Sequence, residues 1–271
     1  MTTVARPPAR HEAGWYTTKG DPLYTIPKAD GKGVRAPTLA DAKKRGDLLP
    51  RVSTILNLLD KPALNDWKIE QAVLAVMTSK QLTGETTDAF VHRVLHVERV
   101  QDQEAATARD RGTEIHSALQ AIFNGEDVPD DIKPWTIPAA AAVSELGERV
   151  CSEKILVGKG YAGRTDLIQE SPDCWWIVDF KTTKKLPEKG SWFEHVLQLA
   201  AYAAAYQELL TVMGFPPPGK PIRTANVYLS TIEPGQFKIL ENDPNWQKAY
   251  NEAFKPLVSV WQYLNSYKAQ Q

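Results

Sequence analysis

The chain has 271 residues, an apolar fraction of 42% and a charged fraction of 24%, which are ordinary values for a globular protein with a sizeable core. Its longest apolar stretch, residues 197–206, is mostly alanine and too short for a membrane span, and residues 1–15 lack the apolar segment of a signal peptide. We therefore expect a cytoplasmic protein that does not contact a membrane.

The charge is distributed unevenly along the chain, although the net charge of −1 gives no sign of nucleic-acid binding overall. Residues 1–52 hold ten Lys or Arg against five Asp or Glu, a local charge of about +5, while the remainder is acidic. This basic segment is either an arm that contacts phosphate groups or a solvated tail.

The N-terminal half is predicted to be helical after a segment without core structure. Residues 1–50 are rich in proline, glycine and charge, so we expect an extended arm or a short hairpin outside the core. Ser53 and Thr54 can cap a helix whose apolar residues begin at Ile55. Longer helices are predicted from apolar spacing at residues 63–78, 88–100, 101–124 and 139–151.

From Lys154 onward the pattern changes to alternation with β-branched residues, which indicates strands. Five strands are predicted, at residues 154–157, 163–169, 175–180, 223–231 and 237–240. Two helices, at residues 193–213 and 246–267, follow the third and the fifth strand. This order predicts an α/β (α+β) fold with a mixed central β-sheet flanked by helices.

Three segments are expected from these changes of character. Residues 1–50 would form a basic N-terminal arm, residues 51–100 a helical elaboration, and residues 101–271 the catalytic core. We expect the chain to form one compact catalytic domain overall.

Two neighbouring predicted strands each carry an aspartate near one end, Asp166 on the first and Asp179 on the second. Lys181 follows Asp179 by two residues, so both side chains point to the same face of the sheet. Two converging carboxylates can bind a hard divalent cation such as Mg²⁺. A lysine beside them can position an attacking water and balance the charge that develops on a phosphate. The pattern therefore indicates phosphodiester hydrolysis.

This arrangement, Asp166 followed by Asp179-Phe180-Lys181, resembles the signature of the PD-(D/E)XK nuclease superfamily. Two flanking motifs narrow the resemblance to the RecB-like exonuclease branch, and they are GTEIH at residues 112–116 and QLAAY at residues 198–202. Glu153 stands where many relatives carry an acidic residue. Residues 50–56 and Trp67 are similar to the N-terminal helical region of phage and mitochondrial genome-maintenance exonucleases.

The resemblance implies a restriction-endonuclease-like core and a DNA exonuclease that depends on one or two Mg²⁺ or Mn²⁺ ions. It assigns metal binding to the side chains of His116, Asp166 and Asp179 and to the backbone carbonyl of Phe180. Lys181 would position the attacking water. The side chains of His116, Asp166, Asp179 and Lys181 are then the catalytic residues.

DNA contacts are expected from Gln198 and Tyr202, which share a helix face at i and i+4, and from Arg164, Lys184 and Lys185. The implied partners are DNA, as single strands or duplex ends, and a phage single-strand annealing or binding protein. The implied role is phage recombination, replication or repair.

Each of these residues also has an ordinary structural interpretation when it is taken alone. An Asp-x-Lys pair often lies on a solvated strand edge, His116 could be a helix histidine with no ligand, and Gln198 with Tyr202 could simply pack. The hypothesis rests on the combination of four features in this order along the chain: His116, Asp166, the Asp-x-Lys pair, and Gln198 with Tyr202. Trp15, Tyr16 and Trp192 could stack on bases or pack in the core. Lys184, Lys185 and Lys189 could hold the DNA backbone or form a solvated loop.

Two rival functions use the same residues. A structure-specific DNA endonuclease would share every catalytic side chain, and a catalytically idle DNA-binding module would recruit another protein. Relatives that carry a four-cysteine iron–sulfur cluster are excluded, because the chain has only Cys151 and Cys174. Both cysteines are expected to be reduced.

Overall fold

The computed structural model describes residues 14–60, 62–96, 101–215 and 219–270. Two units can be distinguished in it, one comprising Met1–Leu58 with Thr113–Gln271 and the other Leu59–Gly112. The first unit contains the central sheet and every side chain that the sequence assigns to catalysis. The division into arm, elaboration and catalytic core stays a prediction.

A five-stranded sheet forms the centre of the first unit, in the order β10-β9-β8-β7-β6. Its strands are β6 (Glu148–Gly158), β7 (Tyr161–Glu170), β8 (Trp175–Thr183), β9 (Ile222–Ser230) and β10 (Phe237–Glu241). Neighbouring strands are antiparallel except for β8 and β9, which are parallel and are joined through helix α7 (Phe193–Val212). The predicted mixed sheet flanked by helices is confirmed.

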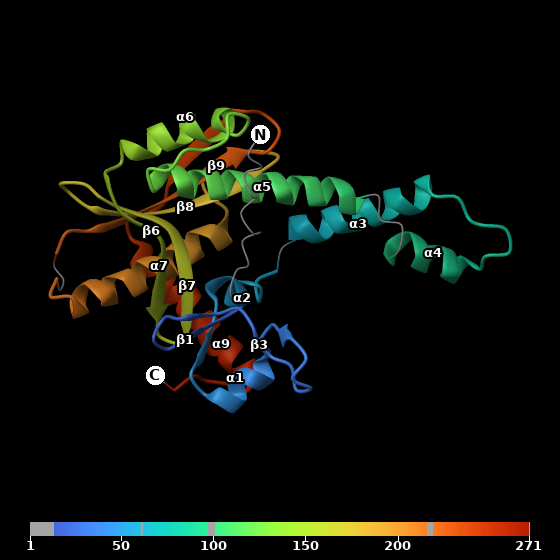
Figure 1. Cartoon of the computed structure of the whole chain (residues 1–271), viewed down its shortest axis with the longest axis horizontal. Helices are drawn as coiled ribbons and strands as arrows, with labels where there is room; N and C mark the ends of the chain where they lie inside the picture. Colours follow the sequence, from blue (N-terminus) through green and yellow to red (C-terminus); the bar gives the residue numbers. More distant parts are fainter. Residues whose placement is uncertain (1–13, 61, 97–100, 216–218, 271) are drawn as a thin grey trace. The chain divides into compact units, whose positions relative to one another are not determined.

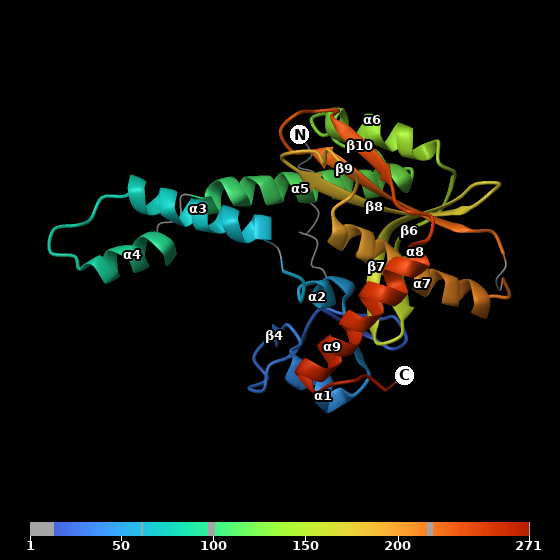
Figure 2. The same ribbon diagram turned by 180° about the vertical axis from the view of Figure 1, so that it is seen from behind.

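Helices cover both faces of this sheet (Figures 1 and 2). On one face, Ile115 and Leu119 of α5 (Gln101–Phe123) share a buried cluster with residues of α6 (Lys133–Ser144) and with Phe180 of β8. On the other face lies α7, where the Ala201 carbonyl accepts a 2.9 Å hydrogen bond from the Tyr161 hydroxyl. Because side chains alternate along a strand, Asp179 and Lys181 point to the α7 side.

Part of residues 14–50 belongs to the core, so the expectation that this segment lies outside the core is wrong for Trp15, Tyr16, Ala42, Leu48 and Leu49. Trp15 and Tyr16 are 8% and 5% exposed, and they lie in a small sheet of order β2-β1-β5. The strands of this sheet are β1 (Trp15–Thr17), β2 (Pro22–Leu23) and β5 (Leu48–Pro50). Trp15 makes edge-on contacts with Trp261 and Tyr267, at ring-centre distances of 6.1 and 6.2 Å. Residues 1–13 lie outside the described residues.

The remaining elements of this N-terminal part are short. They are β3 (Ile26–Pro27), β4 (Val34–Arg35), α1 (Leu39–Arg45) and α2 (Val52–Leu56). Helix α2 starts after Arg51, so Ser53 and Thr54 lie inside the helix and do not cap it.

The predicted alanine-rich helix at residues 139–151 has the wrong bounds. Helix α6 begins at Lys133 and ends at Ser144, and residues 148–151 already belong to β6. Pro134 lies in the first turn of α6, where its missing N–H removes no hydrogen bond. Residues 133–138, which precede the predicted start of the helix, are therefore helical as well.

The closing helix, predicted as one element, is interrupted by a π-helical turn. It consists of α8 (Trp246–Ala249), the π turn (Tyr250–Phe254) and α9 (Lys255–Asn265). Pro256, which has no backbone N–H, lies two residues after the end of the turn, and the missing donor favours the local loss of α-helical hydrogen bonding.

The second unit is helical. It contains α3 (Pro62–Thr78), α4 (Thr87–His96) and the first part of α5, which agree with the predicted helices; residues 97–100 and the Trp67 side chain lie outside the described part. The Arg93 guanidinium donates two hydrogen bonds to the Glu85 carboxylate, at 2.8 and 2.7 Å. Across the described residues of both units, no helix has the length and apolar character needed to cross a membrane. Cys151 and Cys174 are free thiols.

Candidate active site

The candidate site lies where strands β7 and β8 separate. Their ladder of pairs ends at Leu167 and Val178. Beyond this point β7 continues to pair with β6, and β8 continues to pair with β9 as far as Thr183. The next residues, Asp166 and Asp179, therefore stand at the mouth of a fork in the sheet.

Where the two strands separate, a backbone N–H of β8 donates its hydrogen bond to a carboxylate and not to the neighbouring strand β7. The Phe180 amide donates to Oδ2 of Asp166 at 2.7 Å. This hydrogen bond fixes Asp166 beside the strand that carries Asp179. Two aspartates that are 13 residues apart in sequence are thus brought to one place.

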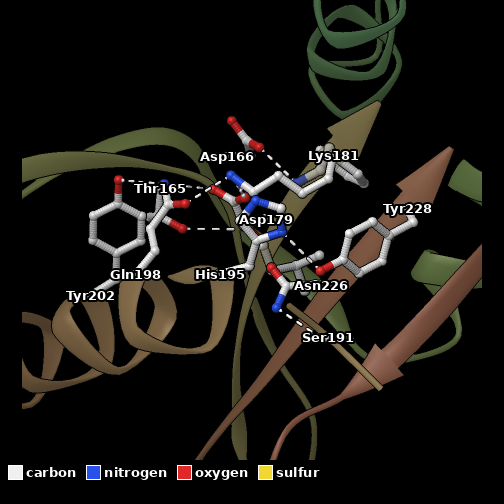
Figure 3. Close-up of polar contacts among 12 residues, drawn as sticks. Thr165, Asp166, Asp179, Lys181, Ser191, His195, Gln198, Tyr202, Asn226 and Tyr228 are labelled. Carbon is white, nitrogen blue, oxygen red and sulfur yellow. Dashed lines mark hydrogen bonds and ion pairs between the residues drawn. The ribbon is translucent and has the colours of Figure 1, made fainter. Parts of the chain in front are cut away.

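Asp179, Lys181, Gln198 and Tyr202 form one polar network on the α7 side of the sheet (Figure 3). The Lys181 ammonium lies 2.6 Å from Oδ2 of Asp179 and donates to Oε1 of Gln198 at 2.8 Å. The Gln198 amide nitrogen donates to the Tyr202 hydroxyl at 3.1 Å and lies 3.5 Å from Oδ1 of Asp179. The i and i+4 residues of α7 are therefore joined to both the lysine and its aspartate.

Tyr202 can lie this close to β7 because residue 163 is glycine. A Cβ at Gly163 would lie 2.6 Å from Cε1 of Tyr202, closer than real Cβ contacts allow. Tyr202 itself is only 4% exposed. Gly163 was not among the predicted site residues, although a glycine inside a strand pattern is a signal of close approach.

Burial dominates the electrostatics of the site. It raises the pKa of Asp179 to about 6, with the Lys181 ammonium acting in the opposite direction and the Asp166 carboxylate raising it further. Burial also disfavours the charged form of Lys181, but the two carboxylates outweigh it, so the pKa of Lys181 is raised and the ammonium persists. Two carboxylates face one ammonium, and this excess of negative charge favours a further cation.

The side chains present fit a hard divalent cation. In the described part of the chain, no three His, Cys, Asp or Glu side chains converge closely enough to hold a metal ion by themselves. Oδ2 of Asp179 is buried, however. It forms an ion pair with the Lys181 ammonium at 2.6 Å, but this contact does not have the angles of a hydrogen bond. Two carboxylates completed by water and phosphate oxygens match the coordination of Mg²⁺ or Mn²⁺.

The other predicted residues differ in their distance from this centre. His116 on α5 is near it, with Nδ1 3.8 Å from Oδ2 of Asp166. Arg164 is paired with Glu153, at 2.7 Å from Nε to Oε2. Lys185 is exposed in the loop after β8 and lies 3.0 Å from Glu188. Lys184, its neighbour in the same loop, is exposed as well.

Strand β9 adds residues that the sequence analysis missed. Asn226 and Tyr228 are the parallel partners of Asp179 and Lys181, and both are fully buried on the same side of the sheet. Nδ1 of His195 lies 2.8 Å from the Tyr228 hydroxyl. Their alternation on a predicted strand was visible in the sequence, but the identity of the neighbouring strand was not.

One comparison with known proteins gives a match over the part of the chain that contains these residues. Residues 160–265 match the family model described as the PD-(D/E)XK nuclease superfamily, and this segment contains Asp166, Asp179, Lys181 and α7. The predicted superfamily domain is therefore confirmed over these residues. PD-(D/E)XK nucleases generally use divalent metal ions and act on DNA.

Two further comparisons add little. No curated protein matches the chain significantly. Among solved structures, the chain is similar to the "Crystal structure of SSO0001", with 11% identity, coverage of 73% of this chain and 86% of that one, and a TM-score of 0.32.

Proposed function

We propose that this chain is a Mg²⁺- or Mn²⁺-dependent DNA exonuclease. The observation that carries the proposal is the fork between β7 and β8, which places Asp166 and Asp179 together with Lys181 beside them. A pair of carboxylates, of which Asp179 is buried, beside a fixed ammonium is a charge arrangement suited to phosphodiester hydrolysis.

Asp166 and Asp179 would hold the metal, with His116 and the Phe180 carbonyl as further ligands. The ion would supply Lewis-acid stabilisation of the charge that develops on the phosphate. Since Lys181 is held between Asp179 and Gln198, its ammonium would donate to the attacking water and offset charge on the phosphate oxygens.

Gln198 acts on the reaction through Lys181. Its amide oxygen accepts from the ammonium, and its amide nitrogen is held by Tyr202. In this role Gln198 and Tyr202 position the lysine, in addition to the DNA contact that the resemblance implies. Arg164, Lys184 and Lys185 would contact phosphate groups.

The exonuclease mode and the biological role rest on the resemblance of residues 112–116 and 198–202 to the RecB-like branch. On the same basis we propose a role in phage recombination, replication or repair, alongside a single-strand annealing or binding protein. A cytoplasmic location follows from this role.

The test uses one oligonucleotide in two forms, linear with an end label and circular with an internal label. With Mg²⁺ or Mn²⁺ the linear form should be degraded and the circular form should persist, and EDTA should stop degradation. Ca²⁺ should support binding with little turnover. Cleavage of the circle would favour the endonuclease, and full activity in EDTA would exclude the metal mechanism. Binding without any cleavage would favour the idle DNA-binding module.

A further inference from the structure

An exposed tryptophan stands at the start of α7, next to the candidate site. Trp192 is the N-cap residue of this helix and is 41% exposed, and the following Phe193 is 58% exposed. Of the tryptophans whose side chains the structure describes, all others are buried or half-buried. A partly exposed indole offers an apolar face on which a planar ligand can stack.

Trp192 is held firmly from beneath. Its backbone N–H donates to the buried Tyr228 hydroxyl at 3.2 Å. Its ring contacts the rings of Tyr228 and His195, at centre distances of 5.3 and 5.2 Å. Tyr228 is held in turn by His195. The indole is thus a pre-positioned surface and loses little conformational entropy when a ligand covers it.

This surface lies close to the catalytic lysine. Tyr228 is the direct parallel partner of Lys181, on the same side of the sheet. One strand spacing plus the ring contact places Trp192 on the order of 10 Å from the lysine. A nucleobase one or two nucleotides away from a phosphate at Lys181 falls within this range.

The loop that precedes Trp192 is basic and well anchored. Lys184, Lys185 and Lys189 are exposed in it. The Lys238 ammonium donates to the Pro187 carbonyl at 2.8 Å, and the Asn226 amide donates to the Ser191 hydroxyl at 3.1 Å. Proteins that bind single-stranded DNA combine lysines that contact the DNA backbone with aromatic side chains on which the bases stack.

We propose that Trp192 stacks on an unpaired nucleobase one or two nucleotides from the scissile phosphate, so that the chain acts on ends with single-stranded character. This inference rests on the proposed nuclease function and specifies its substrate. The ligand is an unpaired base, because the faces of a base inside a duplex are covered by its neighbours.

The test is a double-mutant cycle between the protein and the DNA. Affinity is measured by fluorescence anisotropy on nuclease-resistant phosphorothioate single strands in Ca²⁺, with one abasic site at each of the first four positions from either end. Trp192→Ala should weaken binding to the intact strand by about 5- to 150-fold. This loss should vanish on the strand whose abasic position faces the indole. Trp192→Phe should retain most of the affinity.

Two controls separate stacking from a structural role. Tyr263→Ala removes an aromatic residue on α9 that is 84% exposed and should change no affinity. Binding of the intact strand should quench tryptophan fluorescence in the wild type and much less in Trp192→Phe.

An equal loss for Trp192→Ala on every abasic strand would overturn the proposal, and so would no loss at all. If the chain cleaves DNA while this coupling is absent, the nuclease function stands and the stacking site falls. If the wild type neither binds nor cleaves DNA, both fall together.

Discussion

Replacing Gly163 by alanine tests whether the close approach of Tyr202 to β7 supports both the fold and the active site. The new Cβ would lie 2.6 Å from Cε1 and 3.0 Å from the hydroxyl of Tyr202. Because the ring is buried between α7 and the sheet, it cannot swing into solvent. Overpacking of this kind costs about 1–3 kcal/mol.

A smaller effect acts in the opposite direction. Alanine restricts the unfolded chain more than glycine does, which stabilises the native state by about 0.4–1 kcal/mol. At the middle of both ranges, the net loss of unfolding free energy is about 1.3 kcal/mol. For a unit of this size it corresponds to a Tm lowered by roughly 3–5 °C.

Activity should fall for a separate reason. Any movement of Tyr202 disturbs its 3.1 Å hydrogen bond with Gln198, and through Gln198 the position of Lys181. Misplacement of a reacting group by about 1 Å can cost on the order of 100-fold in rate. We expect single-turnover cleavage to slow by roughly 10- to 100-fold, with DNA affinity changed little.

The assay combines thermal unfolding, followed by circular dichroism, with single-turnover cleavage. Gly14→Ala is the matched control, because no atom lies within 4 Å of the Cβ that it would add. In a Tyr202→Leu background the Gly163→Ala change should cost little stability, since the clashing ring is gone. A wild-type Tm together with full activity in Gly163→Ala would refute the reasoning.

Three further predictions concern catalysis, the core and pH. Asp179→Ala or Lys181→Ala should lower turnover by several orders of magnitude and leave DNA affinity nearly unchanged, because most affinity comes from phosphate contacts elsewhere; near-normal cleavage rates would mean that the site is misassigned. Trp15→Ala should lower the free energy of unfolding by about 3–5 kcal/mol, as measured by urea titration, because this side chain is core and not arm. Arg93 lowers the pKa of Glu85 to about 2. Since the folded pKa is depressed, the stability from this pair is present at neutral pH and is lost as pH falls from about 4.5 through 2. Glu85→Gln should remove that part of the acid dependence, and an unchanged acid titration of helix content would contradict it.

Local sequence patterns determined several features of this protein. Side chains two residues apart on a strand share a face, so Asp179 and Lys181 were correctly placed together. Gln198 and Tyr202 at i and i+4 lie on one face of α7, as the helical repeat requires. The bounds of β7 to β10 were predicted to within three residues at each end, because alternation with β-branched residues is a short-range signal, whereas β6 begins six residues before its predicted start.

Where local signals were ambiguous, the predictions failed. The alanines and the valine at residues 139–143 suit a helix, and Gly147 was not read as the stop signal that separates this helix from the strand beginning at Glu148. Pairing of residues 148–158 with β7 decides that boundary. In the same way, Trp15 and Tyr16 look like residues of a loop until pairing with Leu48–Pro50 buries them.

Only the tertiary structure decided how the chemical groups meet. The separation of β7 from β8 at the residues before Leu167 is a property of two strands with different partners, and it turns the Asp166 carboxylate toward the Phe180 amide. The pairing of β8 with β9, about 45 residues downstream, brings Tyr228 beside Lys181 and sets Trp192 near the site. The chain itself specified the acids, the lysine and their spacing along each element, because these depend on the period of a strand or a helix. The convergence of the elements depends on long-range pairing and burial, which no local period contains.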